Sequence, residues 1–405
     1  MTECRVCSGA LYKFADLGCQ PLSDAFLWPD EVEDEFFFRL TVGICESCTM
    51  VQLTEEVPRE RMFHAGYPYN SSGSVVMRKH FEEIARRFLA TELTGADPFI
   101  VEIGCNDGVM LKTIGEIGVR HLGVEPSGGV AEMARAAGVR VRTDFFEESS
   151  ATKIHASEGP ADVIYAANTI CHIPYIESIF RGVDALLAPG GVFVFEDPYL
   201  SEIIERTAFD QIYDEHFFFF TVRSVQAMAC RFGFELVDVE RLTVHGGEIR
   251  YTIARPGTRQ PTTMVAELLA EEHTRALADP ATFDRFAKAV DRVRDDLITL
   301  LRRLRAEGSR IVAYGATAKS ATVTNYCGIG PDLVSFVCDT TPAKQGRLTP
   351  GSHLPVRPRE AFADPYPDYA LLFAWNHAGE IMAKEQAFSD AGGRWILYVP
   401  EVTIV

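Results

Sequence analysis

A run of polar, titratable residues directly before four phenylalanines carries the clearest chemical signal in this sequence. Tyr213 is followed by Asp214, Glu215 and His216, and the four aromatic residues come next. An imidazole titrates near neutral pH and suits general-base catalysis, while an aromatic wall excludes water from the reacting groups. We therefore predict that Tyr213, Glu215 and His216 are catalytic, with His216 as the base.

A second imidazole, His172, follows a predicted strand within the segment Asn168-Thr-Ile-Cys-His172-Ile-Pro. Ligands of doubly wound sheets bind at the carboxyl ends of the strands, which is where this segment begins. We predict that His172 is catalytic and that Asn168 contacts the cofactor. A buried, hydrogen-bonded structural histidine is the alternative interpretation for both His172 and His216.

Four cysteines form two C-x-x-C pairs near the start of the chain, Cys4 with Cys7 and Cys45 with Cys48. Two such tight turns supply four thiolates in the tetrahedral arrangement that zinc prefers. With four protein ligands the metal would be structural, because no coordination position stays open for a substrate. The other six cysteines lie in or beside apolar runs, where core packing is the expected role.

The segment PFIVEIGCNDGVML predicts a strand, a glycine loop and a helix. Such a turn lets the backbone approach a ligand, and an acid that ends the next strand, here Glu125, can accept hydrogen bonds from ribose hydroxyls. The loop lacks a close G-x-G-x-x-G motif, and its polar pair suits the ammonium and sulfonium of S-adenosylmethionine better than a pyrophosphate. The predicted cofactor-binding residues are Glu102, Gly104, Asn106, Asp107, Glu125, Asp144, Phe145 and Asn168.

Near the C-terminus, a second glycine turn leads into a predicted helix at Gly315-Ala-Thr317-Ala-Lys319. Lysine is rare here, with eight in the chain, so a lysine at a helix start would suit an anionic group of the substrate. We predict Thr317, Lys319, Asn376 and His245 as substrate-binding residues. A purely structural Rossmann-like domain and a second cofactor, with Asp339 as its ribose-binding acid, are both left open.

These residues must be positioned by alternating strands and helices. Cysteines, turns and aromatic residues dominate positions 1–70, and strands then alternate with helices between 78 and 250. A charged helical stretch over 264–307 precedes a second alternation that begins with RIVAYG. The pattern predicts an α/β protein with parallel, doubly wound sheets and three domains, at 1–70, 71–258 and 259–405.

The composition excludes some classes of function. The chain of 405 residues carries 39 Lys and Arg against 57 Asp and Glu, a net charge of −18. Such an acidic chain is not expected to bind nucleic acid or an anionic membrane, both of which are polyanions. No apolar run is long enough to span a membrane, and no signal peptide is visible at the start. We expect a cytoplasmic location.

The combination of the double C-x-x-C region with VEIGCNDG, NTICHIPY, FDQIYDEHF, VHGGEIRY and YGATAKSATVTNY resembles a known family over essentially the whole chain. These are the sugar C-3 methyltransferases of deoxysugar biosynthesis, which act on dTDP-linked 4-keto sugars in antibiotic pathways. The resemblance implies a zinc-binding N-terminal domain, a central class I S-adenosylmethionine domain and a C-terminal Rossmann-like domain, with the sugar nucleotide bound between them. It adds Tyr67 to the catalytic residues, beside His172, Tyr213, Glu215 and His216.

The resemblance is greatest to the enzyme of the tetronitrose pathway, which favours a dTDP-3-amino-2,3,6-trideoxy-4-keto-hexose as substrate. We expect a monomer. An O- or N-methyltransferase of another small molecule, a nicotinamide-dependent sugar-nucleotide oxidoreductase or epimerase, and a non-enzymatic zinc-ribbon module remain alternatives.

Overall fold

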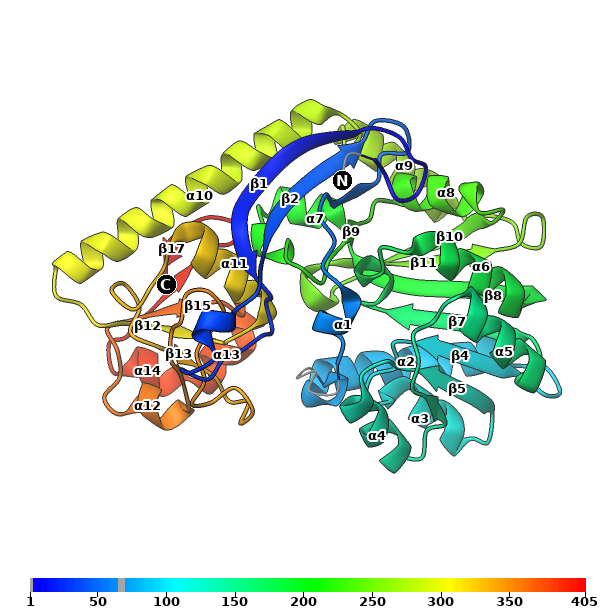
Figure 1. The fold of residues 1–405 in the computed structure, drawn as a ribbon, viewed down its shortest axis with the longest axis horizontal. Helices are drawn as coiled ribbons and strands as arrows, with labels where there is room; N and C mark the ends of the chain where they lie inside the picture. Colours follow the sequence, from blue (N-terminus) through cyan, green and yellow to red (C-terminus); the bar gives the residue numbers. More distant parts are fainter. Residues whose placement is uncertain (1–2, 65–69) are drawn as a thin grey trace.

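The computed structural model describes residues 3–64 and 70–405, so the predicted catalytic residue Tyr67 lies outside the described residues. The described residues build three separate sheets, of four, seven and six strands. A long, bent hairpin near the N-terminus arches between the C-terminal part of the chain and the central part (Figure 1). The predicted α/β class is confirmed.

The first sheet is antiparallel and begins with the hairpin of β1 (Leu11–Pro21) and β2 (Phe37–Cys45). Strand β3 (Val51–Leu53) follows β2, and β9 (Phe218–Phe219) pairs with β3 from far along the sequence. The two cysteine pairs flank the hairpin, one before β1 and one at the end of β2. The first sheet therefore takes its last strand from inside the predicted second domain, directly after His216.

The second sheet has the strand order β10-β11-β8-β7-β4-β5-β6. Its parallel strands are β4 (Phe99–Ile103), β5 (Arg120–Val124), β6 (Val141–Arg142), β7 (Ala161–Ala167) and β8 (Leu187–Pro198). At its edge, β10 (Glu235–Leu242) and β11 (Glu248–Ala254) form a hairpin, and β11 runs antiparallel to β8. The helices are α2 (Val75–Thr91), α3 (Val109–Glu116), α4 (Gly128–Ala136), α5 (Glu148–Glu158), α6 (Ile176–Leu186) and α8 (Val222–Arg231).

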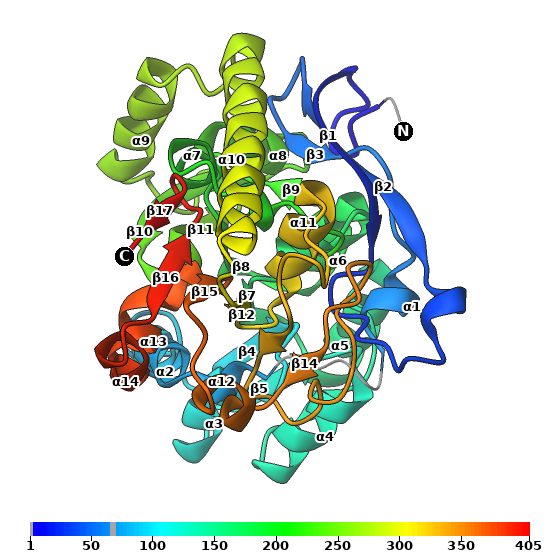
Figure 2. The same cartoon turned by 90° about the vertical axis from the view of Figure 1, so that its left-hand side faces the viewer.

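Two helices, α9 (Thr263–Thr274) and α10 (Pro280–Ala306), connect the second sheet to the third. Helix α10 starts at Asp279, whose carboxylate accepts a hydrogen bond from the amide of Ala281, and Pro280 occupies its first turn. In Figure 2 it runs from the top of the molecule down toward β12 of the third sheet. The charged stretch predicted as helical is thus two helices, and the second of them links the domains.

The third sheet has the order β14-β13-β12-β15-β16-β17. Its strands are β12 (Ile311–Tyr314), β13 (Val337–Cys338), β14 (Val356–Arg357), β15 (Tyr369–Leu372), β16 (Arg394–Leu397) and β17 (Thr403–Ile404). All neighbouring pairs are parallel except β16 with β17. The helices α11 (Ala318–Cys327), α12 (Arg359–Ala363), α13 (Ala378–Lys384) and α14 (Gln386–Asp390) complete this domain.

One predicted helix is divided in the structure. The segment from 377 to 392 forms α13 and α14, which meet at Glu385. The carboxylate of Glu385 is buried, accepts a hydrogen bond from Tyr314 and pairs with Arg359. These contacts of Glu385 with distant residues hold the junction between the two helices. The local helical pattern of the sequence does not reveal them. Among the described helices, none has the length and apolar character needed to cross a membrane.

Candidate active site

A cavity of about 680 Å³ opens where the three domains meet, at the carboxyl ends of β4, β5 and β7. The N-terminal region contributes Asp24 and Arg59 to its wall, and the C-terminal domain contributes Lys319 and Lys344. The predicted site residues that line it are Gly104, Asn106, Glu125, Phe145, Asn168, His172, Tyr213, Glu215, His216, His245, Thr317, Lys319 and Asn376.

Three predicted cofactor residues do not line this cavity. Glu102 is buried beneath the loop, and burial raises the pKa of its carboxyl well above the usual range. Asp107 accepts a hydrogen bond from the amide of Ser72, 3.0 Å away, so its carboxylate holds the segment that enters α2. Asp144 turns toward Arg142, with 3.5 Å between the charged atoms.

The first glycine loop has a backbone conformation and close packing that require glycine at position 104. Gly104 has φ +67°, and a Cβ atom at this position would lie 2.5 Å from the hydroxyl of Thr169. Both oxygens of the Glu125 carboxylate accept backbone hydrogen bonds, from Asn106 at 3.0 Å and from Ser127 at 2.8 Å. The loop and the acid are thereby fixed against each other, and their donor set fits the ribose and methionine groups of S-adenosylmethionine.

Arg59 reaches this end of the cavity from the N-terminal region. Its guanidinium lies over the ring of Phe145, 4.1 Å from the centroid, and over Tyr175 at 4.6 Å. It also pairs with Glu147. No local motif indicated Arg59, because the contact joins residues 86 positions apart in different domains.

His216 is held by both of its ring nitrogens. Nδ1 lies 2.8 Å from the carbonyl oxygen of Gln211, and Nε2 lies 2.9 Å from the hydroxyl of Tyr213. Because a carbonyl can only accept, Nδ1 carries the proton and Nε2 is the accepting nitrogen. Burial, followed by the nearby His172, lowers the pKa of His216 well below its usual value. The imidazole is therefore a neutral base at physiological pH.

His172 stacks between two rings, His216 at 5.3 Å and Phe63 at 5.7 Å between centroids. Its Nε2 is buried and has no hydrogen-bond partner among the described residues. Burial lowers the pKa of His172 to about 4. The structure thus brings the two predicted histidines together as a neutral pair behind an aromatic wall.

Cys171 lies close to this pair, and the ligand-capable atoms of Cys171, His172 and His216 are within 4.8 Å of one another. Both nitrogens of His216 already form hydrogen bonds. We therefore assign no metal to this group.

The second glycine turn contributes Ala316, Thr317 and Lys319 to the cavity wall. Asp339 accepts hydrogen bonds from the amides of Ala316 and Thr341, each at 2.7 Å, so its carboxylate braces the loop. Lys344 donates to the carbonyl of Ala316 at 2.8 Å and lies 3.6 Å from Asp24. Glu125 is held by two backbone amides in the same way, so this bracing leaves the ribose-binding alternative for Asp339 open. Lys344 is a cavity cation that no sequence motif indicated, although lysine is rare in this chain.

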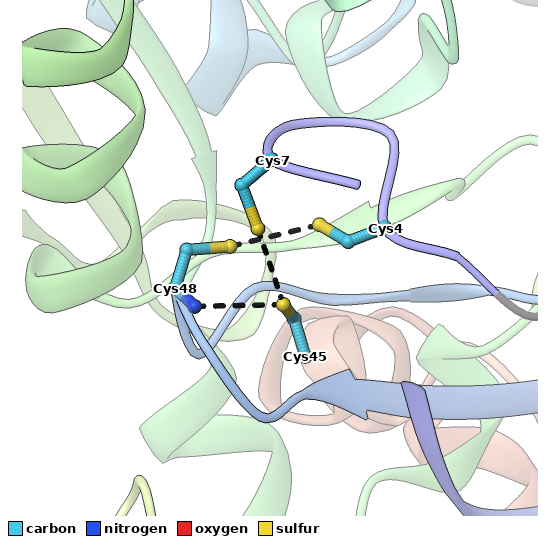
Figure 3. Close-up of side chains that lie close together, drawn as sticks. All are labelled: Cys4, Cys7, Cys45 and Cys48. Atoms are coloured by element: carbon cyan, nitrogen blue, oxygen red, sulfur yellow. Dashed lines mark hydrogen bonds between the residues drawn. The ribbon is translucent and has the colours of Figure 1, made fainter. Parts of the chain in front are cut away.

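The four predicted zinc ligands converge on one point (Figure 3). Sγ of Cys4 lies 3.6 Å from Sγ of Cys48, and Sγ of Cys7 lies 3.4 Å from that of Cys45. Zn–S bonds of about 2.3 Å in a tetrahedron place sulfurs about 3.8 Å apart, so the cluster is close to the required size. Backbone amides of Val6, Ser47 and Cys48 also point at sulfur atoms. The cluster fits a structural zinc ion.

Comparisons with known proteins agree with this architecture. Residues 4–63 match a family model described as "Putative zinc binding domain", residues 77–239 one described as "Methyltransferase domain", and residues 243–400 one described as "C-methyltransferase C-terminal domain". The chain is 35% identical over 410 residues to the C-methyltransferase NovU from Streptomyces niveus, an alignment covering 100% of this chain and 96% of that protein.

Solved methyltransferase structures resemble part of the chain. The magnesium protoporphyrin IX methyltransferase ChlM from Synechocystis, with bound S-adenosylmethionine, is 10% identical, with a TM-score of 0.33, and covers 44% of this chain and 79% of its own. The CcbJ methyltransferase from Streptomyces caelestis is 17% identical, with a TM-score of 0.33, and covers 43% and 89%. The assignment rests instead on the full-length relative and the three family models: this chain belongs to the S-adenosylmethionine-dependent C-methyltransferases with a zinc-binding N-terminal domain.

Proposed function

We propose that this protein transfers the methyl group of S-adenosylmethionine to C-3 of a dTDP-linked 4-keto deoxysugar, through an enolate. The observation that carries the proposal is the neutral, buried imidazole of His216 at the cavity wall, whose Nδ1 donates to Gln211 and whose Nε2 accepts from Tyr213. Methylation at carbon requires a carbanion, and a C–H bond becomes sufficiently acidic beside a ketone. Forming that carbanion requires a base, and the full-length similarity to a C-methyltransferase favours carbon over oxygen or nitrogen as the methylated atom.

In the proposed first step, the Tyr213 hydroxyl turns from Nε2 of His216 to the ketone oxygen of the substrate. The freed Nε2 takes the C-3 proton, and the electron pair of the C–H bond moves to the ketone oxygen. The carbonyl of Gln211 then holds the charged imidazolium through Nδ1. Tyr213 and His172 lie beside the base, where either can donate a hydrogen bond to the developing oxyanion. Glu215, buried in the same wall, balances the charge of the protonated base.

Bound S-adenosylmethionine supplies an electrophilic methyl group on a good leaving group, so the carbanion needs no further activation. The residues of the chain place this group and exclude water. Gly104 and Glu125 would hold the cofactor at one end of the cavity, and Phe63 covers His172 at the reacting centre. Proximity and desolvation then favour attack of the enolate carbon on the methyl group.

The sugar nucleotide would occupy the C-terminal side. Thr317 caps the start of α11, and Lys344 and Thr341 lie in the same wall, so this region can meet a diphosphate. Asn376 and His245 line the cavity between this wall and the base and would contact the sugar. We propose a dTDP-linked 3-amino-2,3,6-trideoxy-4-keto-hexose as the substrate and a monomer as the active form of the protein.

The test is to incubate the enzyme with dTDP-linked 4-keto sugars that carry an amino group or a hydroxyl at C-3. In deuterated water without a methyl donor, NMR should show exchange of the C-3 proton, and with S-adenosylmethionine a new C-methyl signal on C-3. Exchange at C-5 instead of C-3 would show that the enzyme deprotonates the carbon on the other side of the ketone. A methyl signal on oxygen or nitrogen, with no exchange at carbon, would favour the other methyltransferase class.

A further inference from the structure

The side-chain ammonium of Lys319 lies at the cavity wall and has no polar partner among the described residues. Its ammonium lies 5.8 Å from the ring centroid of Trp375. Among the residues that the structure describes, none forms a hydrogen bond or an ion pair with it. The N–H groups of this half-buried ammonium can donate hydrogen bonds to a ligand. Because the group is positively charged, it favours an anionic oxygen as the acceptor.

Two buried carboxyl groups keep this site suited to a cation. Asp210 and Glu248 lie near enough to favour the charged form of Lys319, but neither comes within ion-pair distance. Oδ2 of Asp210 accepts hydrogen bonds from Trp375 at 2.6 Å and Tyr398 at 2.7 Å, and its buried Oδ1 has no hydrogen-bond partner among the described residues. The acids therefore support the charge of Lys319 without binding its ammonium directly.

Lys319 lies at the end of the cavity that holds the base. Its cation–π partner Trp375 donates to Asp210, and the next residue, Gln211, accepts from His216. Burial lowers the pKa of His216, His245 and His377, and the nearby charge of Lys319 lowers each of them further. By contrast, Lys344 is bound to Ala316 and faces Asp24.

We propose that Lys319 is a further catalytic residue, whose ammonium donates a hydrogen bond to the ketone oxygen as it becomes the enolate oxygen. This inference rests on the proposed function and names the group that stabilises its intermediate. The C-3 proton goes to His216, the electron pair goes to the oxygen, and Lys319 keeps its own proton. A preorganised donor of this kind contributes about 10²–10³-fold to the rate in other enzymes.

An anionic oxygen could come from the enolate or from the diphosphate, so the test has two arms. The first measures deuterium exchange at saturating 4-keto sugar by NMR, and the second measures binding of dTDP alone by calorimetry. Lys319→Met should slow exchange by about 10²-fold while changing the Kd for dTDP by less than about threefold. The matched control Lys384→Met, at an exposed lysine of the same domain that does not line the cavity, should change neither exchange nor dTDP binding.

A third variant separates charge from shape. Burial lowers the pKa of Lys319, with Asp210 and Glu248 opposing the shift, so exchange in the wild type should fall on the alkaline side as the ammonium loses its proton. Lys319→Arg stays charged at high pH and should both restore much of the exchange and remove this alkaline limb. Binding of S-adenosylmethionine by calorimetry verifies that each variant is folded.

Two results would overturn the inference. One is a Lys319→Met variant that binds S-adenosylmethionine and exchanges at the wild-type rate. The other is a loss of dTDP affinity with normal exchange at saturation, which would assign Lys319 to the diphosphate. Absence of exchange in the wild-type enzyme with every 4-keto sugar is a different result, because it contradicts the proposed function itself.

Discussion

At the scale of single residues, the site depends on which nitrogen of His216 is free to accept a proton. The sequence indicated the imidazole but not its tautomer. The carbonyl of Gln211 fixes the proton on Nδ1, and the hydroxyl of Tyr213 marks Nε2 as the acceptor. A main-chain carbonyl carries no sequence signal, so this part of the mechanism was visible only in the structure.

Replacing the base tests its role directly. His216→Asn should reduce kcat by about 10²–10⁴-fold, because the variant cannot take a proton from carbon. The Kd for S-adenosylmethionine, measured by calorimetry, should change little, since Gly104 and Glu125 lie on other loops. Near-normal turnover by a folded His216→Asn variant would show that another group is the base.

The pH dependence follows from the burial of His216. Burial, and then His172, lower its pKa below the usual value of 6.5, so the neutral, active form persists as the pH falls through 6.5. The acid limb of kcat/KM should therefore have its midpoint below pH 6.5, as measured in steady-state assays from pH 4.5 to 8. A midpoint at or above 6.5 would contradict a buried neutral base, provided that activity recovers on return to neutral pH.

At the scale of elements, the segment that carries the base is anchored to the C-terminal domain. The hydroxyl of Thr322 in α11 donates to the carbonyl of Ile212 at 2.7 Å, and Asp210 is bound by Trp375 and Tyr398. The helix pattern of α11 was predicted from sequence. Its contact with a segment 110 residues earlier was not, because nothing local to either segment records the pairing.

Removing the hydrogen bond of Thr322 to Ile212 should displace the segment that carries His216 while keeping the imidazole itself. Thr322→Val leaves the buried carbonyl of Ile212 without its donor, at a cost of about 1–3 kcal/mol in folding free energy. We expect lower kcat with an unchanged Kd for S-adenosylmethionine. Thr324→Val is the matched control, because the Thr324 hydroxyl bonds within its own helix, to Ser320. Equal losses of kcat in both variants would argue against an anchoring role.

The zinc cluster acts at the same scale. It joins the two ends of the β1–β2 hairpin, whose sheet also contains β9, two residues after His216. Cys45→Ser should lower the zinc content, reduce Tm by several degrees and decrease turnover, because loss of the metal loosens that sheet. Elemental analysis and calorimetry measure these effects. Cys230→Ser, an exposed cysteine outside the cluster, should change none of them.

At the scale of the whole molecule, the N-terminal hairpin holds the C-terminal domain in place over the cavity. The carboxylate of Glu35 accepts hydrogen bonds from the amide of Gly351 at 2.6 Å and from His353 at 2.8 Å. Leu27 and Leu348 form a β-bridge nearby, and Tyr12 donates to Asp284 on α10. The cavity is therefore a property of three domains together.

Weakening the contact between the hairpin and the C-terminal domain should reduce the binding of the sugar nucleotide more than the binding of S-adenosylmethionine. Glu35→Ala removes both hydrogen bonds, so the KM for the sugar nucleotide should rise severalfold while the Kd for S-adenosylmethionine stays the same. Steady-state kinetics and calorimetry provide the two values. Glu33→Ala, an exposed acid in the short helix Val32–Asp34 that ends directly before Glu35, is the control. A parallel rise in both constants for Glu35→Ala would indicate general unfolding instead.

The sequence by itself determined the features that depend on neighbouring residues. The C-x-x-C turns, the glycine loop after β4, the alternation of strands and helices, and the histidines beside strand ends were all predicted from local spacing. Tertiary structure decided what converges. It brought Arg59, Asp24 and Lys344 into the cavity, turned Asp144 toward Arg142 and recruited β9 to the first sheet. The physical reason is that side-chain periodicity is encoded locally, whereas contacts between distant segments form only when the chain has folded.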